Sequence, residues 1–168
     1  GIFGLGEATL SPTWTGETRP GGLAVIRDLF TPLLLGQDPR NVNALMRELN
    51  RVLVGNPFAK AAIDMALWDL AGKAAGVPVH QLLGGKVRDE LPIKLVIGAV
   101  EPDAAVVLAR RFLDWGVKTL KVKVGPGDDV ARIRAVREFA GPDIPIGIDA
   151  NEGWDIPIAR RLLAELEP

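Results

Sequence analysis

Two lysines separated by one residue, Lys121 and Lys123, are the side chains of this sequence best suited to moving a proton. Residues two apart in a β-strand share a face, so both ammonium groups would point one way and Val122 the other. A lysine beside a second lysine and near a divalent cation loses its own proton more readily and can then remove one from carbon. The spacing indicates an acid/base pair, and a solvated edge strand is the alternative.

A carboxylate and an amide, Asp149 and Asn151, follow the next run of aliphatic residues. Three alternating residues in that run share one face of a strand: Ile144, Ile146 and Ile148. Asp149 and Asn151 therefore fall on the other side, and we expect them near the two lysines at the carboxyl ends of adjacent strands. A carboxylate is a hard oxygen ligand suited to Mg²⁺, which would hold a substrate carboxylate as an enediolate forms. The alternative is that Asp149 only caps a helix.

The elements that must position these side chains repeat at a regular interval. Strand candidates lie at 91–98, 118–124 and 144–149, and helix candidates follow them at 103–115, 128–140 and 158–166. Strand starts about 26 residues apart are typical of a parallel α/β fold. Three units do not close an eight-unit barrel, and no Gly-rich dinucleotide loop follows the first strand. The pattern favours part of a barrel over an open doubly wound sheet.

The first half of the chain predicts a more helical arrangement. A strand at 2–9 and a Pro/Gly/Thr-rich loop at 11–22 precede helices at 23–35, 42–54 and 58–75, with Asn41 as a candidate cap of the second helix. Gly76 and Pro78 would end the third. We expect structural roles for His80, Lys94, Trp68 and Trp154, with a salt bridge as an option for Lys94. Trp14, in the loop, could pack or contact substrate.

Composition excludes several classes of function. A net charge of −1 provides no basic field for nucleic acid or an anionic membrane. The absence of cysteine excludes a disulfide scaffold, a thiol nucleophile and a cysteine-type zinc site. No apolar run is long enough to span a bilayer, so we expect a cytoplasmic enzyme or binding protein. Both ends of the chain read as interrupted elements, which predicts a segment of a longer protein.

A long run from Ala61 to Gly85, AAIDMALWDLAGKAAGVPVHQLLGG, resembles the signature of the mandelate racemase/muconate lactonizing enzyme group of the enolase superfamily. Four shorter segments stand where that family has its own: 4–7, 14–18, 121–123 and 149–154. The Lys-x-Lys form resembles the muconate-cycloisomerase-like subgroup. That subgroup includes cycloisomerases, o-succinylbenzoate synthases, N-succinylamino acid racemases and dipeptide epimerases.

The resemblance implies an α/β fold in two parts, apparently truncated at both ends. Residues 1–88 would form part of an α+β cap domain, and residues 89–168 the first three strand–helix units of a modified (β/α) barrel. Trp14 and Thr15 would belong to a cap loop that closes over the site and helps to select substrate.

The resemblance also assigns roles to the polar residues. Lys123 would be the acid/base residue facing the substrate α-carbon, and Lys121 would tune it. Asp149 would be the first of three Mg²⁺ carboxylates, supported by Asn151. Two more ligands and an opposing lysine would lie outside this segment. Glu167 resembles the next ligand in being followed by proline, but it continues a helix and is too close to Asp149 to lie on the next strand.

The implied function is Mg²⁺-dependent removal of a proton α to a carboxylate through an enediolate. The reaction would be of the racemase, epimerase, cycloisomerase or o-succinylbenzoate-synthase type, so the enzyme would be an isomerase or a lyase. We expect a small-molecule carboxylate substrate, a homo-oligomer at full length and an inactive fragment. An acid-sugar dehydratase of the same superfamily and a non-catalytic α/β binding module are the alternatives.

Overall fold

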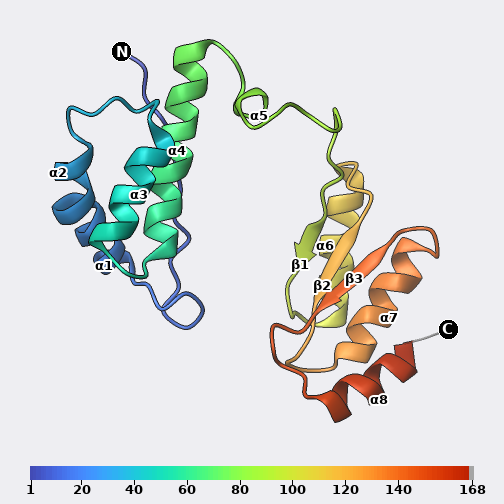
Figure 1. The fold of residues 1–168 in the computed structure, drawn as a ribbon. Helices are drawn as coiled ribbons and strands as arrows, with labels where there is room; N and C mark the ends of the chain where they lie inside the picture. Colours follow the sequence, from blue (N-terminus) through green and yellow to red (C-terminus); the bar gives the residue numbers. More distant parts are fainter. Residues whose placement is uncertain (167–168) are drawn as a thin grey trace. The chain divides into compact units, whose positions relative to one another are not determined.

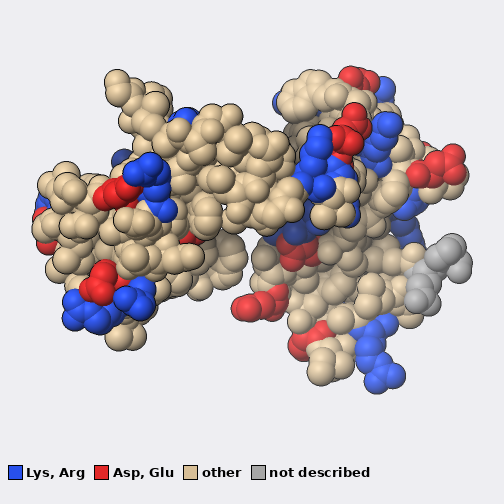
Figure 2. Space-filling view, turned by 45° about the horizontal axis from the view of Figure 1, so that its top comes forward, with Lys and Arg blue, Asp and Glu red and all other residues tan. Residues whose placement is uncertain are grey.

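The structure is a computed structural model that describes residues 1–166. The chain divides into two compact units, the first running from Gly1 to Val87 and the second beginning at Arg88 (Figure 1). Glu167, which the sequence analysis excluded as a metal ligand, lies outside the described residues. Over residues 1–166, no helix is both long enough and apolar enough to cross a membrane. On the face shown in Figure 2, basic and acidic side chains are interspersed in both units.

The first unit is helical, as the sequence predicts, but its first helix begins at Arg19, inside the segment 11–22 that was predicted as a loop. Its elements are α1 (Arg19–Ala24), the π-helix η1 (Val25–Phe30), α2 (Thr31–Leu34), α3 (Val42–Val52), α4 (Pro57–Ala75) and α5 (Val79–Leu82). Two apolar clusters join η1, α2, α3 and α4, one around Phe30, Leu49 and Ala59 and the other around Val42, Leu45, Leu67 and Ala71. Gly76 ends α4 in the left-handed conformation at φ 69°, which glycine adopts without strain.

The π-helical stretch inside the first predicted helix is a feature that periodicity did not reveal. It is followed by Thr31, whose backbone N–H and side-chain hydroxyl both donate to the carbonyl of Ile26, five residues earlier. Pro32 follows and has no N–H to donate to the preceding turn. The widened turn supplies other donors just before the proline, which allows the helix to continue through it.

Asn41 occupies the predicted N-cap position of α3, but not with the capping side chain that was expected. Asn41 precedes α3, but its side chain makes no capping hydrogen bond. Its ψ of 47° lies far from the extended conformation that directs an N-cap side chain onto the first free N–H groups of a helix.

The strand predicted at 2–9 is also wrong, because this segment lies against α4 and pairs with no strand in the described residues. The N–H of Leu5 donates to Asp69 Oδ2 at 2.8 Å, and Lys73 Nζ donates to the carbonyl of Phe3 at 2.9 Å. Gly4 and Gly6 allow the close approach, since a Cβ on Gly6 would lie 1.8 Å from the carbonyl oxygen of Ala62. Helix side chains thus replace a β-ladder for these backbone groups.

The second unit is a three-stranded parallel sheet with helices between and after the strands, which confirms the predicted alternation. Its elements are β1 (Leu95–Ile97), α6 (Pro102–Asp114), β2 (Leu120–Lys123), α7 (Asp129–Ala140), β3 (Ile146–Asp149) and α8 (Ile156–Leu166), and the strand order is β1-β2-β3. The strands are shorter than predicted. Pro92 lies within the first predicted strand and cannot donate to a ladder, and β1 begins only after it.

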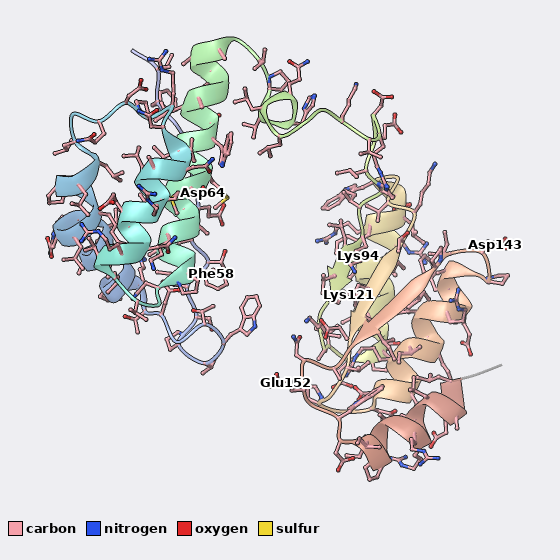
Figure 3. The ribbon with its side chains drawn as sticks, in the orientation of Figure 1. Phe58, Asp64, Lys94, Lys121, Asp143 and Glu152 are labelled. Atoms are coloured by element: carbon pink, nitrogen blue, oxygen red, sulfur yellow. The ribbon has the colours of Figure 1, made fainter. Side chains whose placement is uncertain are left out.

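One face of this sheet is covered and the other is open. Ile97, Leu120 and Val122 are fully buried in a cluster with residues of α6 and α7. The strand register places Lys121 between Val96 and Gly147 on the opposite face, where Val96 remains 46% exposed. Figure 3 shows Lys94 and Lys121 along this open face. The predicted division of β2 into an apolar and a lysine face is therefore confirmed.

Contact between the first residues and α4 predicts that Gly6→Ala destabilises the protein. The added methyl group cannot fit beside the Ala62 carbonyl oxygen, and relieving such overpacking typically costs about 1–3 kcal/mol. Urea unfolding of the intact protein measures the loss.

Leu5→Ala is the matched control, because the Leu5 side chain is 68% exposed. It should change the free energy of unfolding by less than about 0.5 kcal/mol. Equal losses for the two variants would contradict the close packing of this segment on α4.

Candidate active site

The two lysines of β2 converge on one carboxylate oxygen of β3. Lys121 Nζ and Lys123 Nζ each lie 2.6 Å from Asp149 Oδ2. Lys123 is directly paired with Asp149 in the sheet, whereas Lys121 is paired with Gly147. Since Gly147 has no side chain, Lys121 can cross to Asp149 along the strand. The structure thus brings together the three residues that the sequence predicts at this edge.

A tight turn after β3 adds the amide of Asn151 to this cluster. Asn151 has a φ of 43° and Glu152 a φ of 67°, so the chain reverses direction through two left-handed residues. The backbone N–H of Asn151 donates to Asp149 Oδ1 at 3.0 Å. Its side-chain oxygen accepts a hydrogen bond from Lys123 Nζ. Asn151 therefore holds both the carboxylate and the lysine, and Figure 3 shows the neighbouring Glu152 on the loop beyond β3.

The electrostatics of the cluster favour an ionised carboxylate. Lys121, then Lys123 and then the Asn151 N–H hold the pKa of Asp149 well below its ordinary value of 3.8. The three charged side chains are only 24–30% exposed, so solvent screens their interactions incompletely. Two ammonium groups against one carboxylate leave an excess of positive charge on this face, which favours an anionic ligand.

Asp149 fits the role of a single metal ligand. Its carboxylate is ionised, and hard oxygen donors are the ligands that Mg²⁺ prefers. Within residues 1–166, no group of three or more histidine, cysteine, aspartate or glutamate side chains is close enough together to hold a metal ion. The described residues therefore contain no complete set of magnesium ligands.

The predicted substrate loop belongs to the first unit and is anchored there. The hydroxyl of Thr15 donates to the Ser11 carbonyl at 2.9 Å and accepts from the N–H of Glu17 at 3.2 Å. Glu17 is 6% exposed, and its carboxylate accepts from the first N–H groups of α4, at 2.9 Å from Phe58 and 3.2 Å from the next residue. Trp14 is 76% exposed with its ring 5.9 Å from that of Phe58. The loop is thus a fixed structure that presents an exposed indole.

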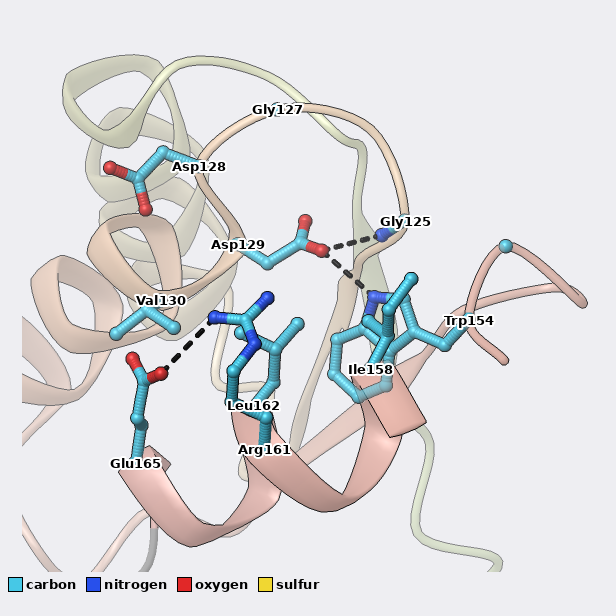
Figure 4. A pocket seen from close by; sticks show the side chains of 11 residues that line it. Gly125, Gly127, Asp128, Asp129, Val130, Trp154, Ile158, Arg161, Leu162 and Glu165 are labelled. Carbon is cyan, nitrogen blue, oxygen red and sulfur yellow. Dashed lines mark hydrogen bonds and ion pairs between the residues drawn. The ribbon is translucent and has the colours of Figure 1, made fainter. Parts of the chain in front are cut away.

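Sequence reasoning missed a buried ion pair beneath the strand ends. Asp129 and Arg132 are 5% and 3% exposed and lie 2.9 Å apart at the start of α7. Asp129 also accepts from the indole N–H of Trp154, at 2.9 Å (Figure 4). Trp154 packs against the sheet core, as predicted, but this hydrogen bond was not foreseen. The only available signal was an acidic pair after Gly-Pro-Gly, which reads equally well as a helix cap.

Lys94 lies outside the cluster. It precedes β1, its side chain is exposed, and it forms no ion pair within residues 1–166. The salt bridge considered for it is therefore absent from the described structure.

Comparison with known families identifies both units. Residues 1–84 match the N-terminal domain of mandelate racemase/muconate lactonizing enzyme, and residues 104–168 match the enolase C-terminal domain-like family. Among curated proteins, an N-succinyl-L-Arg/Lys racemase of Bacillus cereus is 38% identical over 156 residues, covering 92% of this chain and 42% of its own. A chloromuconate cycloisomerase of Cupriavidus pinatubonensis is 34% identical over 173 residues, covering 99% of this chain and 46% of its own.

Solved structures show the same similarity. A dipeptide epimerase of Enterococcus faecalis, complexed with Mg and the dipeptide L-Leu-L-Tyr, has a TM-score of 0.91 and 36% identity, covering 99% of this chain and 47% of that one. The Bacillus cereus racemase has a TM-score of 0.88 and 36% identity, covering 98% and 46%. The chain thus spans about half the length of the relatives it matches. The predicted fold class, part of a cap domain followed by the first strand–helix units of a barrel, is confirmed.

The contacts of Asp149 predict how its carboxyl group titrates. In metal-free intact protein, ¹³C NMR should place its midpoint below 3.8. Because the folded pKa is lowered, the stability that this group contributes is present above the unfolded value and is lost as pH falls through the folded one. Lys121→Met should move the midpoint back towards 3.8.

Arg161→Met is the matched control, since it removes a cation that pairs with exposed Glu165 and not with Asp149 within residues 1–166. It should leave the Asp149 midpoint unchanged. A wild-type midpoint at or above 3.8 would contradict the lysine contacts.

Proposed function

Because the chain belongs to the mandelate racemase/muconate lactonizing enzyme group of the enolase superfamily, we propose that the intact protein removes a proton α to a carboxylate with the help of Mg²⁺, through an enediolate. The observation that carries this proposal is the convergence of Lys121 and Lys123 on Asp149 at the carboxyl ends of neighbouring strands. Active sites of (β/α) barrels lie at that end. Racemases, epimerases and cycloisomerases among the relatives support the same first step.

Lys123 is the acid/base residue in this proposal. In its neutral form its Nζ takes the α-proton, and the electron pair of the broken C–H bond moves into the substrate carboxylate to give the enediolate. Asn151 and Asp149 hold Nζ at the end of a flexible four-carbon chain, which limits the positions it can sample. Returning the proton to the same carbon, or breaking another bond, determines whether the product is an isomer or an elimination product.

Lys121 contributes charge. Its ammonium group lies on the same face, where negative charge develops on the substrate carboxylate during proton removal. A cation fixed there before the reaction stabilises that charge without rearranging solvent. Lys121 also neutralises part of the charge of Asp149, with which it shares a 2.6 Å contact.

Asp149 would hold the magnesium ion, with further ligands from outside this segment. A bound divalent cation would polarise the substrate carboxylate and stabilise the enediolate. The ionised state of Asp149 supports this role, because protons compete for the carboxylate only well below neutral pH.

We assign residues 1–88 to the cap and residues 89–168 to the barrel. The loop carrying Trp14 and Thr15 would then select among substrates through the exposed indole.

Substrates are proposed to be small carboxylates. One relative is named as a racemase of N-succinyl-L-Arg/Lys and another as an epimerase of hydrophobic dipeptides. Both kinds of compound are amino acid derivatives that carry an acylated amino group and a carboxylate. We further propose a cytoplasmic homo-oligomer.

Lys123→Ala should strongly slow the exchange of the substrate α-proton with solvent deuterium. N-succinyl-L-lysine, L-Ala-L-Glu and a chloromuconate form the substrate panel, and ¹H NMR follows exchange or turnover. Loss of a general base should lower the rate by about 10²–10⁴-fold.

Lys94→Ala is the matched control, because this lysine is exposed just before the neighbouring strand β1 and lies outside the cluster. It should exchange at the wild-type rate. Exchange near the wild-type rate in Lys123→Ala would overturn the role of Lys123. Dehydration of acid sugars in the absence of exchange on the panel would favour a dehydratase, and inactivity on all of them would favour a non-catalytic module.

Asp149→Asn should weaken Mg²⁺ binding by about 10–100-fold or more, because an amide oxygen carries no net charge. Isothermal titration calorimetry of the intact protein with Mg²⁺ alone measures this without any substrate. Asp143→Asn is the control, since Asp143 lies at the opposite end of β3 (Figure 3). Equal Mg²⁺ affinity in wild type and Asp149→Asn would exclude Asp149 as a ligand.

A further inference from the structure

The guanidinium group of Arg132 bonds to the end of β2 and to the loops that follow β1 and β2. It donates to the carbonyl of Val100, after β1, to the carbonyl of Lys123, the last residue of β2, at 3.3 Å, and to the carbonyl of Pro126 at 3.2 Å. The planar guanidinium has five N–H donors in a fixed geometry, and here most of them are used on backbone oxygens and one carboxylate. One buried side chain therefore ties together chain segments that are far apart in the sequence.

Asp129 extends the same connection to the third strand. Its Oδ1 accepts from Arg132, while its Oδ2 accepts from the N–H of Gly125 and from the indole of Trp154, each at 2.9 Å (Figure 4). Trp154 lies three residues after Asn151, in the loop that follows β3. Because a buried charge is costly unless it is paired and hydrogen-bonded, these bonds hold both loops to the ion pair.

The two loops also touch through their backbones. A Cβ on Gly153 would lie 2.9 Å from the Ala150 carbonyl oxygen and 3.1 Å from the Cα of Gly125. The loop after β2 and the turn after β3 are therefore packed so closely at Gly125 and Gly153 that a side chain on Gly153 would not fit between them. A shift of one loop must displace the other, and the turn that it displaces carries Asn151, which bonds Lys123 Nζ.

From these contacts we infer that Arg132, held by Asp129, is a positioning residue for Lys123. It fixes the backbone carbonyl of Lys123 directly and, through Asp129 and Trp154, fixes the turn that holds the lysine Nζ. Arg132 itself lies in the helix-covered side of the sheet and touches no reacting atom. The inference rests on the proposed function of Lys123 as the acid/base residue.

Arg132→Lys in the intact, Mg²⁺-loaded enzyme tests this role. Lysine keeps the charge but loses the planar fork, so it cannot serve the same carbonyls and Asp129 together. We expect kcat to fall about 10–100-fold with KM changed less than about threefold, as for other supports of catalytic groups. Arg132→Met should lose at least as much activity.

Arg137→Lys is the matched control on the same helix. The Arg137 guanidinium also donates to backbone carbonyls, those of Gly141 and Ile144 at 2.7 Å each, but at the other end of α7. This variant should lower Tm while kcat stays near the wild-type value. Equal losses of kcat in the Arg132→Lys and Arg137→Lys variants, or a lower Tm with unchanged kcat in Arg132→Lys, would reduce Arg132 to a purely structural residue.

Trp154→Phe keeps the test decisive if Arg132 variants do not fold. Phenylalanine retains the packed ring but removes the N–H that donates to Asp129, so kcat should fall about two- to tenfold without loss of fold. Unchanged kcat would overturn the inference.

Deuterium exchange by the wild-type enzyme decides the proposed function separately. If wild type is inactive, crystal structures of wild type and Arg132→Lys still show whether the Lys123 Nζ–Asp149 contact moves.

Discussion

The arrangement of this site depends on the covering of only one face of a parallel sheet. Side chains alternate along a strand, and α6 and α7 bury the set that contains Leu120 and Val122. The intervening residues of β2 are then forced to the open face, and both are lysines. Parallel pairing brings the ends of β2 and β3 to the same edge, so Lys123 meets Asp149 in register. Apolar burial on one side thus determines where the charges lie on the other.

Charges placed in this way must be compensated where they stand. Lys121 and Lys123 share one carboxylate, and Asn151 supplies a donor to that carboxylate and an acceptor to the second lysine. On the helix-covered side, Asp129 and Arg132 compensate each other and bond to backbone groups. The two polar clusters lie on opposite sides of the sheet and share the residue Lys123, one through its side chain and the other through its carbonyl.

Much of this site could be predicted from the sequence, because it rests on local periodicity. The period-two pattern of 118–124 and 144–149 was enough to place both lysines and Asp149 on one face. The buried pair could not be predicted in this way, since Asp129 and Arg132 act on partners in three other segments. The spacing of residues within α7 does not predict a long-range hydrogen bond to the carbonyl of Val100 or Lys123.

The errors at the start of the chain have the same origin. Alternating residues at 2–9 indicate an extended backbone but not what satisfies its hydrogen bonds. Here the partners are Asp69 and Lys73 of α4, and Gly4 and Gly6 permit the contact. The error in the length of the strand predicted at 91–98 has another origin. Pro92 is visible in the sequence, and because it has no N–H to donate, it could have been used to place the start of that strand later.

The attachment of the first residues to α4 has a consequence for how the chain responds to its medium. The Asp69 and Lys73 side chains are 28% and 40% exposed, so dissolved ions reach them. Their hold on the extended segment weakens as ionic strength rises, whereas the apolar core beneath the sheet is strengthened by salting-out ions. In a salting-out salt, the polar attachment of the first residues and the apolar cores of the same polypeptide therefore respond in opposite directions.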